Sequence, residues 1–144
     1  MPAPAAPLKI LLVEDEAYFR LFVGKMLRLV IPCTVVEAKN GQEAIDLCRT
    51  SDPDLILLDI YMPLLDGLEA LPQIRALKPA TPIVMLTSVS EEAVVEKCVT
   101  LGASYLIRKD VHALLLKTEI QKMLHIFFPL QSKAHEQQPS AAPA

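Results

Sequence analysis

The sequence predicts one α/β domain in which helices cover both faces of a parallel β-sheet. Short apolar segments alternate with amphipathic segments five times along the chain, and this alternation is typical of parallel strands that are joined by helices. The composition agrees, because 52% of the 144 residues are hydrophobic and 22% are charged, as in an ordinary globular domain.

The first part of the chain contains three predicted strands and two predicted helices. Ile10–Val13 is a continuous apolar run with β-branched ends, which suits a strand that is buried on both faces. Glu16–Val30 follows, with apolar residues at helical spacing. Thr34–Val36 is the second strand, Gly41–Arg49 is a helix after an Asn-Gly turn, and the apolar run Leu55–Leu58 is the third strand.

The second part of the chain repeats the same alternation. Leu68–Leu77 is a helix, and Pro72 predicts an irregular or kinked start to it because proline has no amide proton to donate. After the strand Pro82–Leu86, the next helix begins at Ser90, a good N-cap residue, and ends near Gly102. The last predicted elements are the strand Tyr105–Ile107 and the helix Val111–Phe127.

Both ends of the chain differ from its middle. Residues 1–7 and 129–144 are rich in Pro, Ala, Ser and Gln and contain 6 of the 12 prolines. Neither segment has an apolar pattern that could bury a face, so we predict that both are disordered tails. The packed domain is therefore expected to span residues 8–128.

Charge and cysteine content exclude several classes of protein. The net charge is −3 and no basic run is present, which argues against direct nucleic acid binding. The three cysteines, Cys33, Cys48 and Cys98, have no CxxC spacing and are expected to be free thiols in a reducing compartment. No apolar run approaches the ~18 residues of a membrane span, and no secretory signal is recognisable. We therefore expect a cytoplasmic protein without a membrane segment.

The polar residues of interest follow the predicted strands. In an open parallel sheet, ligands bind at the carboxyl ends of the strands, so these residues are expected to converge. They are Glu14, Asp15 and Glu16 after the first strand, Asp59 after the third, Thr87 and Ser88 after the fourth, and Arg108, Lys109 and Asp110 after the fifth.

This residue set predicts a site for a metal ion and a phosphoryl group. Neighbouring carboxylates repel one another, and Mg²⁺ relieves the repulsion because it prefers oxygen ligands. The Lys109 ammonium and the Thr87 hydroxyl are donors for anionic oxygens. Asp59 could then act as the nucleophile and form an acyl phosphate. Glu16 is interpreted as an ordinary first-turn acid of the following helix.

Four motifs resemble one known family. LLVEDE, LLDIYMPLLDG, MLTS and YLIRKD, in this order and at the ends of predicted strands, resemble the receiver domain of two-component response regulators over Leu8–Phe127. The resemblance implies a flavodoxin-like three-layer sandwich, (βα)5, with a parallel five-stranded sheet in the order 2-1-3-4-5. It also implies Mg²⁺- or Mn²⁺-dependent transfer of a phosphoryl group from a sensor histidine kinase, or a phosphotransfer protein, to an aspartate.

The resemblance also assigns roles to individual residues. Asp59 matches the phosphoacceptor, Thr87 the hydroxyl that hydrogen-bonds the phosphoryl group, and Lys109 the lysine that pairs with it. The implied metal ligands are Asp15 directly, Glu14 through water, Asp59, and the backbone carbonyl of Tyr61. Pro63 and Gly67 match loop-shaping positions, and we interpret Asp66-Gly67 as a turn and helix start.

One departure from the family concerns the fifth strand. Many relatives carry an aromatic residue three positions before the lysine, where this chain has Leu106, and Tyr105 comes one residue early. Tyr105 is then expected on the other face of the strand. Either the aromatic part of the switch is absent, or the strand end is shifted by one residue and Arg108 takes the place of the lysine; the intervals from Gly102 and Thr87 favour Lys109.

The resemblance implies a phosphorylation-dependent switch rather than an enzyme that acts on another substrate. The implied switching face consists of the fourth helix, the fifth strand and the fifth helix, and it would bind a downstream protein target or form a homodimer. The fifth helix carries a surplus of apolar residues, and we expect part of it to dock a partner or a second copy of the chain. The surplus consists of a stripe, Leu116, Ile120, Met123 and Phe127, and of Leu114 and Leu115, which flank the start of the stripe.

Four alternatives compete with this interpretation. The chain could be a receiver-like interaction module that no longer takes phosphate, or a regulatory domain excised from a longer multidomain response regulator. A haloacid-dehalogenase-like phosphatase would need a second aspartate where this chain has Tyr61. A flavodoxin would need a phosphate-binding loop where this chain has Glu14, Asp15 and Glu16, which repel phosphate.

Overall fold

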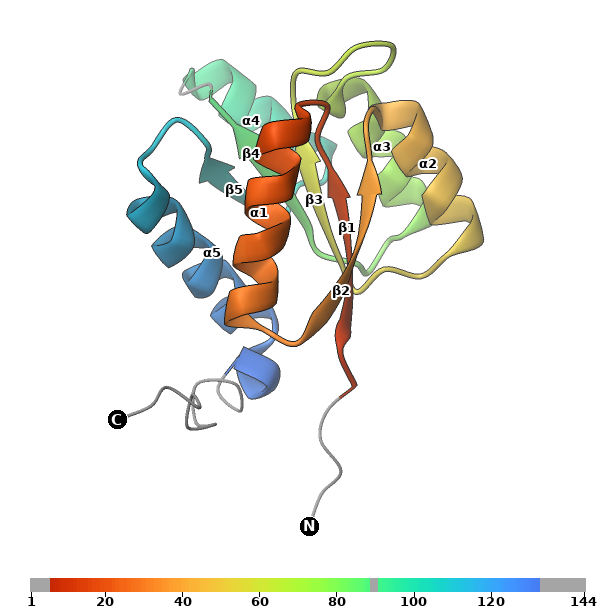
Figure 1. Cartoon of the computed structure of the whole chain (residues 1–144). Helices are drawn as coiled ribbons and strands as arrows, with labels where there is room; N and C mark the ends of the chain where they lie inside the picture. Colours follow the sequence, from red (N-terminus) through yellow and green to blue (C-terminus); the bar gives the residue numbers. More distant parts are fainter. Residues whose placement is uncertain (1–5, 89–90, 133–144) are drawn as a thin grey trace, which may run out of the picture.

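A parallel five-stranded sheet forms the middle layer of the protein (Figure 1). The computed structural model describes residues 6–88 and 91–132. The strand order is β2-β1-β3-β4-β5 and all neighbours pair in parallel, which confirms the predicted sheet. The strands are β1 (Leu8–Val13), β2 (Cys33–Ala38), β3 (Leu55–Asp59), β4 (Ile83–Thr87) and β5 (Tyr105–Arg108).

Helices cover both faces of the sheet, as the sequence predicted. The helices are α1 (Ala17–Val30), α2 (Gly41–Thr50), α3 (Gly67–Leu77), α4 (Glu92–Leu101) and α5 (Ala113–Phe127). One buried apolar cluster joins α1 and α5 to the sheet, and a second joins α2, α3 and α4 to the other face. Alternate strand residues enter alternate clusters, because successive side chains of a strand point to opposite faces.

The strands extend further than their apolar runs. β3 ends at Asp59, β4 at Thr87 and β5 at Arg108, each one residue beyond the predicted strand. The register explains the difference, because Asp59 pairs with Leu86 and Thr87 pairs with Arg108. Backbone pairing continues irrespective of side-chain polarity, so three polar residues that were predicted to follow the strands lie within them.

The helix starts depend on caps that the apolar pattern does not reveal. Asp66 caps α3 through a reciprocal capping box with Glu69, which confirms that Asp66-Gly67 starts the helix. The helix begins at Gly67 and continues past Pro72 to Leu77, and the kink that Pro72 suggests stays a prediction. His112 caps α5 by accepting a hydrogen bond from the Leu115 amide.

The start of α4 also differs from the prediction. Glu91 occupies the N-cap position and makes no side-chain cap hydrogen bond. Ser90 itself lies outside the described residues. The helix ends as predicted at Gly102, whose φ of 111° lies in the left-handed region that favours glycine.

The apolar surplus of α5 serves the core more than the surface. Leu116, Ile120 and Met123 are buried in the cluster beneath α1 and α5, and Phe127 packs against the same cluster. This stripe is therefore not the part of the apolar surplus that is available for docking. Leu114 and Leu115 remain outside it, with 70% and 39% of their surfaces exposed.

Three further expectations concern the chain as a whole. Helical structure continues through residues 129–132, where the tail was predicted to begin, and Ser132 is buried. The three cysteines are free, and Cys48 and Cys98 are buried. Within residues 6–88 and 91–132, no helix has the length and apolar character needed to cross a membrane.

Replacing Gly67 by alanine is expected to destabilise the fold. A Cβ atom at this position would lie 2.1 Å from the backbone oxygen of Asp59, and the Gly67 amide already donates a hydrogen bond to Ile60. Relief of such a clash costs about 1–3 kcal/mol, which urea unfolding would measure as a lower midpoint. An unchanged midpoint would contradict this account of the loop.

Gly24→Ala is a suitable control. A Cβ atom there meets only the flexible end of Arg28, at 3.3 Å. Because Gly24 lies within α1, alanine should raise the free energy of unfolding by up to about 1 kcal/mol.

Candidate functional site

Three carboxylates converge at the carboxyl edge of the sheet. Glu14 and Asp15 directly follow β1, and Asp59 ends the neighbouring strand β3. One oxygen from each of the three side chains lies within 4.8 Å of the others. The strand order brings residue 59 beside residues 14 and 15, so the cluster predicted from the sequence is present.

Lys109 lies against two of these carboxylates. Its Nζ atom donates to Oε1 of Glu14 at 2.5 Å and to Oδ2 of Asp59 at 3.2 Å. The exposed fractions of the three side chains are 13% for Lys109, 0% for Glu14 and 5% for Asp59. A buried carboxylate is costly without a partner, and the Lys109 ammonium provides that partner for both acids.

Arg108 does not take the place of the lysine. Its guanidinium pairs with the exposed Asp110 through two hydrogen bonds, while Lys109 reaches Glu14 and Asp59. The Lys109 amide also donates to the Thr87 carbonyl at 2.9 Å, which ties the residue to the end of β4. Of the two cations that the sequence left open, the structure places Lys109 in the site.

The close contact of the charges changes their protonation behaviour. Burial, together with the hydrogen bond to Asp59, raises the pKa of the Glu14 carboxyl to about 8, although Lys109 opposes this shift. For Lys109, burial acts to lower the pKa, but hydrogen bonds and charge attraction from Glu14 and Asp59 outweigh it, so the pKa of Lys109 is raised. The lysine therefore stays charged, while Glu14 competes for a proton.

The donor set fits a hard divalent cation. Three carboxylates face one ammonium, which leaves two negative charges without compensation when all groups are ionised. Oxygen ligands and this charge match the preference of Mg²⁺. Asp15 is exposed and lies at the outer side of the buried pair, so a cation could reach the cluster from solvent.

Two residues of the first turn of α1 contact the site, although the sequence did not indicate it. Arg20 donates from Nη1 to the Glu14 carbonyl at 2.8 Å and pairs with Glu37 at 3.6 Å. The ring of Phe19 lies 4.6 Å from the ammonium of Lys109. Both were interpreted as ordinary residues of an amphipathic helix, and the signal that could have revealed them is their position directly after the acidic pair.

The loop after Asp59 is held by backbone contacts. The Gly67 amide donates to the Ile60 carbonyl at 2.6 Å, and the Gly41 amide donates to the Leu65 carbonyl at 2.9 Å. Leu64, at the tip of the loop, has a φ of 68° and is exposed, which is an uncommon conformation for leucine. Tyr61 belongs to this loop and its side chain is exposed; the metal-ligand role of its carbonyl stays a prediction.

The remaining predicted site residues lie on β4, β5 and α5. Thr87 ends β4 and is buried. Tyr105 points into the cluster of α1 and α5, where its ring meets the edge of Phe127 at 6.2 Å, whereas Leu106 packs into the opposite cluster. Leu115 lies at the start of α5 and is partly exposed. The two residues of β5 therefore point to opposite faces, as expected.

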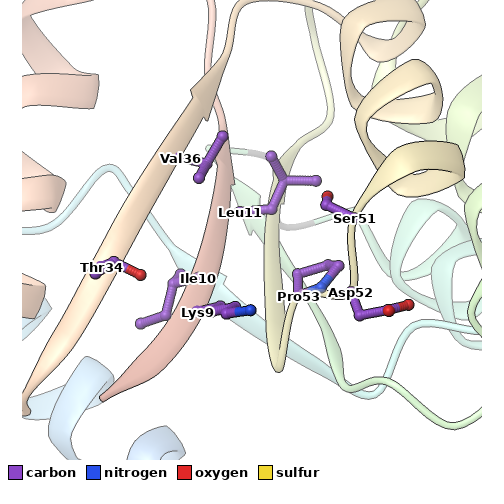
Figure 2. A pocket seen from close by; sticks show the side chains of 8 residues that line it. All are labelled: Lys9, Ile10, Leu11, Thr34, Val36, Ser51, Asp52 and Pro53. Carbon is purple, nitrogen blue, oxygen red and sulfur yellow. The ribbon is translucent and has the colours of Figure 1, made fainter. Parts of the chain in front are cut away.

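A separate hollow lies beside the first half of β1 and β2 (Figure 2). Its volume is about 200 Å³. It is lined by Lys9, Ile10, Leu11, Thr34, Val36, Ser51, Asp52 and Pro53. Glu14, Asp15 and Asp59 are not among the lining residues, so the hollow belongs to a different region of the surface.

Comparisons with known proteins agree with this geometry. Residues 10–121 match the family of the response regulator receiver domain. The transcriptional regulatory protein PdtaR of Mycobacterium tuberculosis is 41% identical over 105 residues, which are 72% of this chain and 51% of that protein. The chain therefore spans about half the length of this relative. The chemotaxis protein CheY of Halobacterium salinarum is 36% identical over 101 residues, 70% of this chain and 83% of that protein.

A solved structure with a similar fold is the receiver domain of the sensor histidine kinase PA1611 from Pseudomonas aeruginosa. It is 29% identical, with a TM-score of 0.74, and the match covers 85% of this chain and 98% of that chain. That domain has a magnesium ion coordinated in its active site cleft. The fold of this chain is thus similar to that of a receiver domain that binds magnesium.

Without a metal ion, the free energy of unfolding should fall as the pH rises from about 4.5 to about 8. The pKa of Glu14 is raised from its ordinary value of 4.5 to about 8 in the folded chain. The unfolded chain therefore releases this proton first, and the stability that it contributes is complete below pH 4.5 and lost above about pH 8. Urea unfolding in EDTA across this range measures the effect.

Glu14→Gln provides the comparison for this pH dependence. Glutamine cannot titrate, so in Glu14→Gln the free energy of unfolding should fall less steeply with rising pH than in the parent. Glu96→Gln, on the exposed side of α4, should show the same fall with pH as the parent. Equal slopes in Glu14→Gln and the parent would show that Glu14 does not hold a proton in the folded chain.

Proposed function

Because the chain belongs to the family of response regulator receiver domains, we propose that Asp59 accepts a phosphoryl group from the histidine of a sensor kinase or a phosphotransfer protein. The observation that carries this proposal is the position of Asp59. Its carboxylate ends a central strand, lies 3.2 Å from the Lys109 ammonium and shares a cluster with Glu14 and Asp15. A carboxylate in such a site can serve as a nucleophile.

The transfer exchanges one bond to phosphorus for another. An oxygen of Asp59 attacks the phosphorus atom of the phosphohistidine, a P–O bond forms and the P–N bond breaks. The departing imidazole nitrogen keeps the electron pair and is protonated. Lys109 provides positive charge beside the attacking oxygen, because its ammonium already contacts Asp59.

The acidic cluster supports a metal requirement for this transfer. Asp15, Asp59, the Tyr61 carbonyl and, through water, Glu14 are the groups that would hold Mg²⁺ or Mn²⁺. When bound, the ion offsets the negative charge of the transferred phosphoryl group. Binding at this cluster would also displace the proton that Glu14 takes up.

Thr87 is the proposed hydrogen-bond donor to the phosphoryl group. It is buried at the carboxyl end of β4, next to the strand that carries Asp59. Its carbonyl accepts a hydrogen bond from the Lys109 amide, so a displacement of Thr87 is passed directly to the end of β5. A contact that forms only with the phosphorylated state would shift the equilibrium towards an active conformation.

The face formed by α4, β5 and α5 is the proposed output surface. Cys98 is the one fully buried residue of α4, and the start of this helix lacks a side-chain cap, so the helix can move at low cost. Leu114 and Leu115 are exposed at the start of α5. Leu106 stands where an aromatic switch residue is common in the family, so the proposed switch operates without that ring.

The same proposal extends to the partner of the domain, its location and the protein that contains it. The output partner is a downstream protein target or a second copy of the chain, and the proposed location is the cytoplasm, where sensor kinases deliver their phosphoryl group. The length of the mycobacterial relative, of which this chain matches 51%, favours a second setting in which the domain regulates a longer protein. Catalysis is limited to its own phosphorylation and dephosphorylation in both settings.

Incubation with acetyl phosphate and Mg²⁺ should add one phosphate to the parent chain, detected by intact mass. Asp59→Asn should give no adduct, because the amide cannot act as the nucleophile. Asp46→Asn, on the exposed face of α2, is the control and should behave as the parent. No adduct in the parent, or an equal adduct in Asp59→Asn, would refute the proposal.

Leu115→Glu should weaken self-association and target binding of the phosphorylated chain without affecting its phosphorylation. A charge at this partly exposed position opposes burial in an interface, and we expect self-association of the phosphorylated chain to weaken by roughly tenfold, about 1.4 kcal/mol. Sedimentation velocity over a concentration series measures this change. Leu21→Glu, exposed on α1, is the control, and unchanged self-association and target binding in Leu115→Glu would rule out this surface.

A further inference from the structure

We propose that Phe19 is a positioning residue, whose ring face holds the ammonium of Lys109 against Asp59 and Glu14. The inference rests on the proposed phosphoacceptor function of Asp59. Its basis is the distance of 4.6 Å between the Lys109 Nζ atom and the centre of the Phe19 ring. A cation at this distance from an aromatic face is attracted by the negative charge density of the ring.

The contacts of the ammonium leave one side for the ring. A lysine ammonium has three donors, and Glu14 and Asp59 accept hydrogen bonds from it at 2.5 Å and 3.2 Å. The Phe19 ring closes a further side, which would otherwise be open to water. The ammonium is thereby enclosed between two carboxylates and an aromatic face, which agrees with its exposed fraction of only 13%.

This enclosure limits the freedom of a flexible side chain. Lysine carries its charge on a four-carbon stem, and without the ring the ammonium could turn towards solvent. Phosphoryl transfer to Asp59 benefits from a positive charge that is in place before the reaction, because no reorganisation is then needed. Phe19 would act through Lys109 and not through direct contact with the phosphoryl group.

The local sequence explains how the ring reaches the lysine. α1 begins two residues after Asp15, so its first turn lies directly above the acidic pair. Phe19 packs against the cluster of α1 and α5, and its ring meets the ring of Phe22 at 6.4 Å. The next residue, Arg20, holds the backbone of Glu14. Consecutive residues therefore support the lysine and the acidic pair.

The test replaces Phe19 by pentafluorophenylalanine, which keeps the shape of the ring but removes the negative character of its face. Phosphorylation by acetyl phosphate should become roughly threefold to tenfold slower. Phe19→Leu should show a similar loss, whereas Phe19→Tyr should retain the parent rate within about twofold because the ring face is kept. Phe22→Leu, which alters packing beside Phe19, should leave the rate near that of the parent.

A second measurement does not depend on phosphorylation. In the unphosphorylated chain, the ε-methylene protons of Lys109 should be shifted upfield by the Phe19 ring in a proton–carbon NMR spectrum, and Phe19→Leu should remove the shift. Absence of the shift in the parent overturns the proposal. A parent that shows the shift but takes no phosphate refutes the function of Asp59 while supporting the contact. A pentafluorophenylalanine variant phosphorylated at the parent rate overturns the positioning role.

Discussion

The site depends on the salt bridges that Lys109 makes with Glu14 and Asp59. Two carboxylates, Glu14 and Asp59, are buried at the carboxyl edge of the sheet, and a lysine 95 residues along the chain from Glu14 contacts both. Without it, two negative charges would face each other in a region of low polarity. When all groups are ionised, the three carboxylates and the one ammonium leave two negative charges, which is the charge that a divalent cation would offset.

Contacts of the backbone hold the loops around the site in place. Gly67 lets the chain pass directly beside the carbonyl of Asp59, Arg20 holds the carbonyl of Glu14, and Gly41 ties the start of α2 to the loop after β3. The contacts of Gly67 and Arg20 each fix one loop, and the Gly41 contact joins the start of α2 to the loop after β3. Such a support limits the freedom of the Asp59 carboxylate, which suits the role of nucleophile that we propose for it.

The support is weaker on the side of α4. This helix contributes one fully buried residue and its start lacks a side-chain cap, although Gly102 and Arg75 hold its end through hydrogen bonds of the guanidinium to the Gly102 carbonyl. The acidic loops therefore have more backbone and side-chain contacts than the start of α4 has.

The sequence alone determined the order of the elements, the sheet and the convergence of Asp59, Glu14, Asp15 and Lys109, because apolar periodicity and strand-end position are local properties. It did not reveal that Phe19 and Arg20 contact the site, and it favoured Lys109 over Arg108 by spacing alone. It also did not show which part of the apolar surplus of α5 is buried, whereas the structure buries the stripe that contains Leu116. Only the tertiary structure decides such contacts, because an apolar or basic residue of a helix or strand has the same local pattern whether it meets the core, solvent or a charge.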